Sequence, residues 1–281
     1  MTNGSGKEMI EEISNATGSG QMFNHLNLIY EYPFVTLRID RENDQLNTLD
    51  IETCREIYDA LEIIWDDEQI KTLIVTGNDR VFSTGADLKW LSNVSPYAAR
   101  HFSRRGKEAF GRLEELNIPT IAAINGLCIG GGLELALCCD FRIASTKARF
   151  SQSETNIGLI PGWGGCLRLP RVIGQANALR LIYTGEMINA KDALELGLVQ
   201  QLVPAENDCV EAAKEYAKPF VNRSKIALMF AKRAVVTGIE IPLKYAYELE
   251  SDLFGFTWTS EDCKEGIQSF LKKEKPKWKD K

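Results

Sequence analysis

Hydrophobic and polar positions along the chain alternate between two periods, one typical of strands and one typical of helices. Segments 34–40 (FVTLRID) and 72–77 (TLIVTG) are rich in β-branched residues and end in turn-forming residues, as strands do. Between them, four apolar residues recur at helical spacing: Cys54, Ile57, Leu61 and Ile64. Asp50 precedes this run and is a residue type that favours the N-cap of a helix. The pattern therefore predicts a strand, a helix and a second strand.

The alternation of strand and helix patterns continues to about residue 203. A helix is expected over about 97–116, where apolar residues again recur at helical spacing, and a strand is expected over 120–125. A run of three glycines then leads into an apolar helical segment, and two short strands follow over 141–146 and 148–152. Strands that are mostly buried and alternate with helices indicate an α/β fold.

The strand pattern stops near residue 205, and the rest of the chain favours helices. Three segments are amphipathic at helical spacing: CVEAAKEYAKPFV, KIALMFAKRAVVTG and PLKYAYELESDLFGFT. Because such helices cannot enclose a core of their own, we expect them to pack on the α/β part or on a neighbouring subunit. The chain is thus expected to divide into a disordered polar arm (1–21), an α/β core (22–203) and a helical region (204–281).

Composition narrows the class of protein. The chain has 281 residues, of which 44% are hydrophobic and 26% charged, and these values are typical of a globular protein. A net charge of −6 argues against a general nucleic-acid binder, and no apolar stretch reaches the ~20 residues of a membrane span. The N-terminus lacks the apolar segment of a secretory signal. The seven cysteines form no CxxC pair and lie mostly in apolar runs, which favours reduced core cysteines and a cytoplasmic location.

Several common sites are excluded by their motifs. No glycine run is followed by Lys and Ser/Thr as in the Walker A loop, and neither glycine-rich segment fits the dinucleotide pattern G-x-G-x-x-G. The only two histidines are His25 and His101, so a histidine-based catalytic triad or metal site is not expected. No carboxylate cluster has EF-hand spacing. We expect neither a metal nor a cofactor, and the chemistry is left to carboxylates and backbone amides.

Three segments concentrate the candidate chemistry: FSTGADLKWL (82–91), AINGLCIGGGLELA (123–136) and FSQSETNIGLIPGWGG (150–165). Gly131 begins a predicted helix, so its N–H has no partner inside the helix, and Ala86 is the natural second donor. Two such amides can hold an oxyanion that develops on a carbonyl group. Glu134 and Glu154 are expected to face the same pocket, where burial and mutual repulsion suit them to proton transfer.

Each of these features also has a purely structural explanation. A triple glycine usually reflects close packing, and a single buried glutamate more often serves as hydrogen-bonded scaffolding than as a catalyst. The combination of the three segments is far more specific than any one of them.

The sequence resembles the enoyl-CoA hydratase/isomerase family, the crotonases, from about Phe34 to Trp278. Six family segments occur in order: Asn47-Thr48-Leu49, Gly85-Ala86-Asp87-Leu88-Lys89, the segment from Asn125 to Ala136, the segment from Phe150 to Gly165, and the distal segments 185–204 and 265–278. The resemblance implies a spiral of ββα units, with C-terminal helices that assemble homotrimers, often paired into hexamers. It also implies a coenzyme A thioester as substrate.

The resemblance carries roles to individual residues. The amides of Ala86 and Gly131 match the oxyanion hole for the thioester oxygen. Glu134 matches the residue that activates water for attack at Cβ, and Glu154 matches the one that exchanges the proton at Cα. The amide of Gly162 matches a position that helps to place the water.

Other matched positions concern coenzyme A and the acyl group. Lys89, Phe270 and Lys273 match residues that touch the phosphates or adenine of coenzyme A, the last two from a neighbouring subunit. The sequence departs from the family at three places. Trp163 stands where a small residue is common, Ser153 replaces the usual proline, and Trp90 replaces a frequent acidic residue. Trp163 and Trp90 are therefore candidates for the acyl pocket, although packing under the loop explains Trp163 equally well.

The function implied by the resemblance is that of a hydro-lyase (EC 4.2.1.-). It would add water reversibly across the 2,3 double bond of a short- to medium-chain enoyl-CoA, or dehydrate a 3-hydroxyacyl-CoA. Another crotonase reaction, such as isomerisation, hydrolysis or decarboxylation of an acyl-CoA, is the alternative. Retention of Glu134 argues against an isomerase. A non-catalytic CoA-ester-binding or RNA-binding protein is the third possibility, and the acidic balance disfavours it. Acyl-chain length, reaction direction and the choice of trimer or hexamer stay open.

Overall fold

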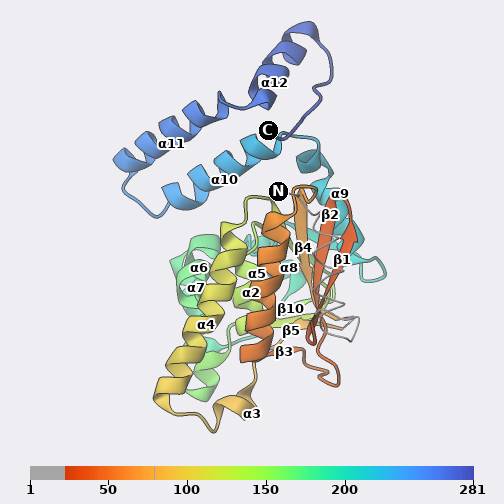
Figure 1. Ribbon diagram of the computed structural model, residues 1–281. Helices are drawn as coiled ribbons and strands as arrows, with labels where there is room; N and C mark the ends of the chain where they lie inside the picture. Colours follow the sequence, from red (N-terminus) through yellow and green to blue (C-terminus); the bar gives the residue numbers. More distant parts are fainter. Residues whose placement is uncertain (1–22, 79) are drawn as a thin grey trace.

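A computed structural model describes residues 23–78 and 80–281. Its largest element is a six-stranded sheet of order β1-β2-β4-β7-β9-β12 (Figure 1). The strands are β1 (Leu26–Glu31), β2 (Phe34–Ile39), β4 (Thr72–Thr76), β7 (Thr120–Ile124), β9 (Phe141–Ser145) and β12 (Gln201–Val203). β1 pairs antiparallel with β2, and every other pair in this sheet is parallel. The predicted arm over 1–21 lies outside the described residues.

A four-stranded sheet of order β11-β10-β8-β5 accompanies the large sheet. Its strands are β5 (Val81–Ser83), β8 (Leu127–Ile129), β10 (Arg149–Ser151) and β11 (Ile188–Asn189). Three times, a strand of the large sheet is followed by a strand of the small one and then by helical structure: β4 and β5, β7 and β8, β9 and β10. This repetition is the series of ββα units that the resemblance implies. A third, two-stranded sheet pairs β3 (Thr48–Leu49) with β6 (Gly85–Ala86).

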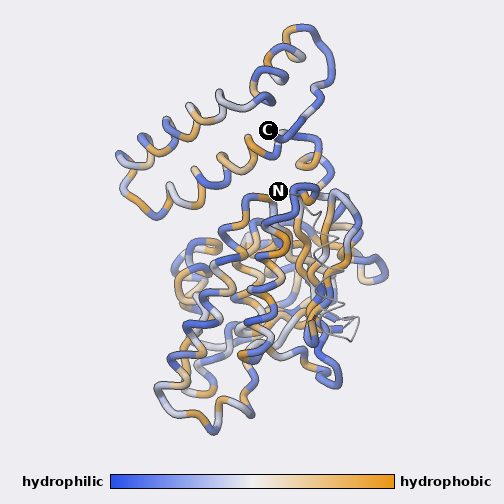
Figure 2. Tube along the Cα trace, in the orientation of Figure 1, coloured by the Kyte–Doolittle hydropathy of each residue, from blue (hydrophilic) through white to orange (hydrophobic). Residues whose placement is uncertain are grey.

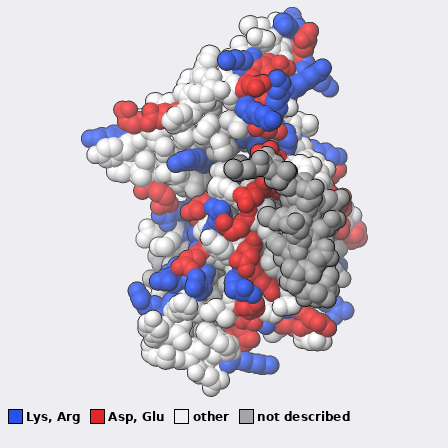
Figure 3. Space-filling view, in the orientation of Figure 1, with Lys and Arg blue, Asp and Glu red and all other residues white. Residues whose placement is uncertain are grey.

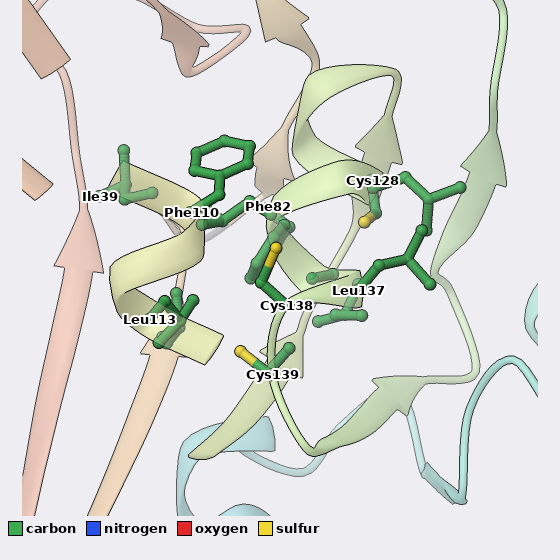
Figure 4. Close-up of a cluster of buried hydrophobic side chains, with 14 of the residues drawn as sticks. Ile39, Phe82, Phe110, Leu113, Cys128, Leu137, Cys138 and Cys139 are labelled. Carbon is green, nitrogen blue, oxygen red and sulfur yellow. The ribbon is translucent and has the colours of Figure 1, made fainter. Parts of the chain in front are cut away.

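Helices surround the sheets and close the core. They are α2 (Ile51–Asp66), α3 (Leu88–Leu91), α4 (Pro96–Glu115), α5 (Gly131–Leu137), α6 (Gly165–Ile173), α7 (Gln175–Thr184) and α8 (Ala190–Glu195), with the 3-10 helix η1 (Glu154–Ile157). α2 packs against α4, and Asp50 caps α2 as predicted, accepting a bond of 2.8 Å from the Thr53 N–H. Phe82, Phe110 and Leu113 come together in the core with Cys128, Cys138 and Cys139 (Figure 4).

The central strands β4 and β7 of the large sheet are buried on both faces. Leu73 and Val75 of β4 belong to the main core, whereas Ile74 between them belongs to a second cluster with Ile121 and Ala213. Ala213 lies on α9 (Cys209–Val221), which covers this second face. A strand that is buried on both sides needs a continuous apolar run, and this need explains the sequence TLIVT.

Three further helices extend away from this body: α10 (Lys225–Gly238), α11 (Leu243–Thr257) and α12 (Glu261–Lys272) (Figure 1). Hydrophobic residues occur along these three helices as well as in the body of the molecule (Figure 2). Several of their large apolar side chains are exposed, and Phe270 is 82% exposed.

On the visible part of the face over α2 and α4, acidic and basic side chains are mixed (Figure 3). Within residues 23–78 and 80–281, no helix combines the length and apolar character that a membrane crossing requires.

Asn47 joins three parts of the core and provides a test of this architecture. Its side chain is fully buried, its φ is +51°, and its Nδ2 donates to the carbonyls of Ile39 (2.9 Å) and Phe82 (2.8 Å). Asn47→Ala removes one donor from each of these two buried carbonyls and puts alanine in a left-handed conformation. We expect it to lower the free energy of unfolding by about 2–4 kcal/mol, as measured by urea denaturation.

Asn43 is the matched control, because it also has a positive φ (63°) but an exposed side chain. Asn43→Ala shares the backbone penalty and loses no buried hydrogen bond. Equal destabilisation by the two substitutions would contradict the role assigned to the Asn47 side chain.

Candidate active site

One cavity of about 1020 Å³ opens beside the glycine turn and collects residues from all three candidate segments. Its lining includes seven of the residues that the sequence singled out: Ala86, Lys89, Gly131, Glu134, Glu154, Gly162 and Trp163. Segments that lie far apart in the chain thus meet at one place, because the ββα repeat returns each strand-to-helix turn to the same side of the small sheet.

The turns that carry Ala86 and Gly131 touch each other. A Cβ added to Gly85 would lie 2.5 Å from the Gly131 nitrogen, so only glycine permits this approach. Ala86 is held by the pairing of β6 with β3, in which it stands opposite Leu49. Gly131 is the first residue of α5, where the N–H has no acceptor within the helix. The backbones of the two expected oxyanion donors are therefore adjacent on the cavity wall.

Glu134 projects from the first turn of α5 and is only 2% exposed. Its Oε1 accepts hydrogen bonds from the backbone N–H groups of Trp163 and Gly165, each at 2.7 Å. Sequence reasoning assigned a backbone role to Gly162 and missed these two amides. The carboxylate is thereby fixed to the segment that follows Glu154.

Burial dominates the ionisation of Glu134. Removal from water raises its pKa to about 7 from an ordinary 4.5, and the nearby charge of Glu154 adds to the rise. The two backbone donors act in the opposite direction, because they stabilise the ionised form. Near neutral pH this carboxyl group is therefore able both to take up and to release a proton.

Glu154 begins η1 and lies against the glycine turn from the other side. A Cβ on Gly130 would lie 3.2 Å from its Oε1. The same Oε1 accepts a bond of 2.9 Å from the Nε2 of Gln152, a fully buried side chain that the sequence reading did not single out. Among the described residues, Oε2 of Glu154 is buried and has no hydrogen-bond partner. Burial raises the pKa of Glu154 as well. The sequence signal that could have identified Gln152 is its position two residues before Glu154.

Comparison with known proteins identifies the family of this chain. The model of the family described as enoyl-CoA hydratase/isomerase matches residues 9–281. The chain belongs to the enoyl-CoA hydratase/isomerase family. It is 38% identical over 254 residues to a crotonyl-CoA hydratase of Syntrophomonas wolfei, covering 90% of this chain and 97% of the relative. It is 37% identical to a short-chain-enoyl-CoA hydratase of Clostridium acetobutylicum, covering 82% and 88% of the two chains.

Solved structures place the fold in the same family. An enoyl-CoA hydratase from Bacillus anthracis superposes with a TM-score of 0.86 at 36% identity, covering 92% of this chain and all of the other. The predicted family and the crotonase-type α/β fold with its C-terminal helices are thus confirmed.

The remaining candidates are distributed over two regions of this crotonase fold. Lys89 on α3 and Trp163 line the cavity, whereas Trp90 lies behind it and packs on Phe102 with ring centroids 4.8 Å apart. Phe270 and Lys273 belong to the C-terminal helical region, at the opposite end of the molecule from α3 (Figure 1). One chain therefore does not bring these two residues to its own cavity. Among the described residues, no group of three His, Cys, Asp or Glu side chains has a geometry that could hold a metal ion.

The raised pKa of Glu134 makes a prediction about stability. Between an ordinary pKa of 4.5 and the folded value of about 7, the unfolded chain releases a proton that the native protein retains. Glu134 therefore destabilises the fold progressively as pH rises through this window, by about 3 kcal/mol once it is complete. Glutamine accepts the same two amide bonds and does not ionise. We expect Glu134→Gln to be more stable than wild type at pH 8, and this gain to disappear near pH 4.5.

Urea denaturation at the two pH values checks this expectation. Glu195→Gln, an exposed substitution on α8, controls for the loss of one carboxylate and is expected to change the free energy of unfolding little at either pH. A gain for Glu134→Gln that does not depend on pH, or a loss at pH 8, would contradict the burial of an ionisable Glu134.

Proposed function

We propose that this protein is an enoyl-CoA hydratase that reversibly adds water across the 2,3 double bond of short- to medium-chain enoyl-CoA thioesters. In the reverse direction it dehydrates 3-hydroxyacyl-CoA. The observation that carries the proposal is the meeting of two carboxyl groups, the buried Glu134 and the partly buried Glu154, at one cavity beside the adjoining turns of Ala86 and Gly131. Relatives named as crotonyl-CoA and short-chain-enoyl-CoA hydratases support it.

The oxyanion develops first in this scheme. When the oxygen of water bonds to C3 of the enoyl group, the π electrons move through C2 onto the thioester oxygen. The amides of Ala86 and Gly131 donate to that oxygen, and each such donor contributes about 3–4 kcal/mol to transition-state stabilisation. The small side chains at this turn leave room for the thioester to approach the backbone.

The two carboxyl groups account for the protons. Burial raises the pKa of both carboxyl groups, and the charge of Glu154 raises that of Glu134 further, so both groups are suited to exchange protons with a substrate. Following the family motif, Glu134 takes a proton from water as the C3–O bond forms, and Glu154 gives its proton to C2. Proton exchange with solvent through the open cavity then restores the starting protonation states of Glu134 and Glu154. Gln152 orients Glu154, and Gly162 helps to place the water.

The remaining parts of the proposal concern substrate binding and assembly. Lys89 on the cavity wall binds the phosphates of coenzyme A. Coenzyme A is part of the substrate, so the proposed reaction uses no separate cofactor. Phe270 and Lys273 reach coenzyme A from a neighbouring subunit of a homotrimer or dimer of trimers. The exposed apolar side chains of α10 to α12 support such an assembly. We place the protein in the cytoplasm.

Hydration of crotonyl-CoA tests the proposed function. The purified protein is expected to remove the ultraviolet absorbance of the conjugated thioester in buffer without added metal or cofactor. Glu134→Gln and Glu154→Gln are each expected to lower kcat by about 10²–10⁴-fold, because each removes one proton-transfer group. Glu195→Gln is the matched control and should retain wild-type activity.

Two outcomes would redirect the assignment. If no 2-enoyl-CoA is hydrated, the hydratase function is wrong. If Glu134→Gln keeps full activity on a 3-enoyl-CoA, the isomerase alternative, which needs Glu154 alone, is favoured.

A further inference from the structure

We infer that the indole ring of Trp163 forms the closed end of the acyl cavity and restricts the enzyme to short acyl chains of about four carbons. The inference rests on the proposed function and specifies its substrate class. Trp163 lines the cavity and only 3% of its surface is exposed, so almost all of the residue is embedded in the core beside the cavity.

The ring occupies space that two glycines leave empty. A Cβ on Gly131 would lie 2.3 Å from Cζ3 of Trp163, and a Cβ on Gly106 of α4 would lie 2.2 Å from its Nε1. The indole therefore spans the gap between the oxyanion turn and α4. No side chain larger than hydrogen at either position is compatible with this placement.

Aromatic neighbours complete the wall. The Trp163 ring packs edge-on against Phe102 and Phe110, with centroids 4.9 and 5.3 Å away. Trp90 packs on the far side of Phe102, with centroids 4.8 Å apart. The four rings pack against one another in a continuous series, and Phe102 and Trp163 of this series line the cavity.

The wall is also fixed in position. The N–H of Trp163 donates to Glu134 at 2.7 Å, and its carbonyl accepts from Arg168 Nη1 at 3.0 Å. Arg168 is itself paired with Glu114, with 2.8 Å between Nη2 and Oε2. The indole Nε1 donates to the Phe102 carbonyl at 3.4 Å. Because backbone and ring are both held, the indole cannot swing aside for a longer substrate.

The position of the reacting atoms then sets the chain length. Under the proposed function the thioester oxygen binds at the Gly131 amide and C3 approaches Glu134, whose carboxylate accepts a hydrogen bond from the Trp163 N–H. The acyl chain consequently arrives at the indole just beyond C3. A four-carbon chain ends there, whereas each further methylene must displace the ring or stay outside.

Trp163→Ala and Trp163→Leu test this inference against 2-enoyl-CoAs of four, six, eight and ten carbons. For the wild type, kcat/KM is expected to fall by at least about a hundredfold from four to ten carbons, since a pocket discriminates by roughly 10–200-fold per misplaced methylene. Both variants are expected to raise the ten-to-four-carbon ratio of kcat/KM by at least tenfold. Trp65→Ala, which removes a tryptophan half-exposed on α2, should leave the ratio unchanged.

Binding of saturated thioesters supplies a readout that does not need catalysis. By calorimetry, Trp163→Ala is expected to favour decanoyl-CoA over butyryl-CoA at least tenfold more than the wild type does, and circular dichroism confirms that the variant is folded. Wild-type kcat/KM values that are equal for four and ten carbons, or folded variants with an unchanged binding preference, would overturn the inference. Absence of any hydration by the wild type would instead contradict the proposed function.

Discussion

The pair of hydrogen bonds from the amides of Trp163 and Gly165 to Glu134 Oε1 is the interaction on which the site depends. These hydrogen bonds connect the first turn of α5 with the segment that leads into α6. Neither of these two parts of the chain belongs to a strand. They fix the carboxylate, and they also fix the backbone from which the Trp163 ring projects. The reacting acid and the closed end of the cavity are therefore positioned by a single contact.

This contact also explains why a buried carboxylate is tolerated here. An isolated anion at 2% exposure is strongly disfavoured, and two short amide bonds offset part of that cost without removing it. The remaining penalty appears as a pKa near neutrality and as a fold that is less stable than it would be with a neutral residue. The same property makes the group useful for proton transfer, so stability and activity oppose each other at this position.

The sequence predicted those parts of the structure that depend on residues close together in the chain. The strands β2, β4, β7 and β9 and the N-cap at Asp50 follow from apolar period and residue type, and the family motifs named several of the residues that line the cavity. The two-residue strands β3 and β6 were not predicted, because they are too short to show a period. The hydrogen bonds from the amides of Trp163 and Gly165 to Glu134 were missed because every residue except proline has a backbone N–H, so the residue type does not reveal which one donates. The placement of the Trp163 ring depends on Gly106, which lies in a different helix and has no signal of its own.

Infrared difference spectroscopy of the wild type and Glu134→Gln across pH 4 to 9 tests the central claim most directly. The claim is that burial at the amide contact holds the proton of Glu134 near neutrality. The wild type is predicted to show a carboxylic-acid C=O band that the variant lacks and that disappears with a midpoint near pH 7. A difference band that titrates near the ordinary value of 4.5 would show that Glu134 is solvated and would contradict the account.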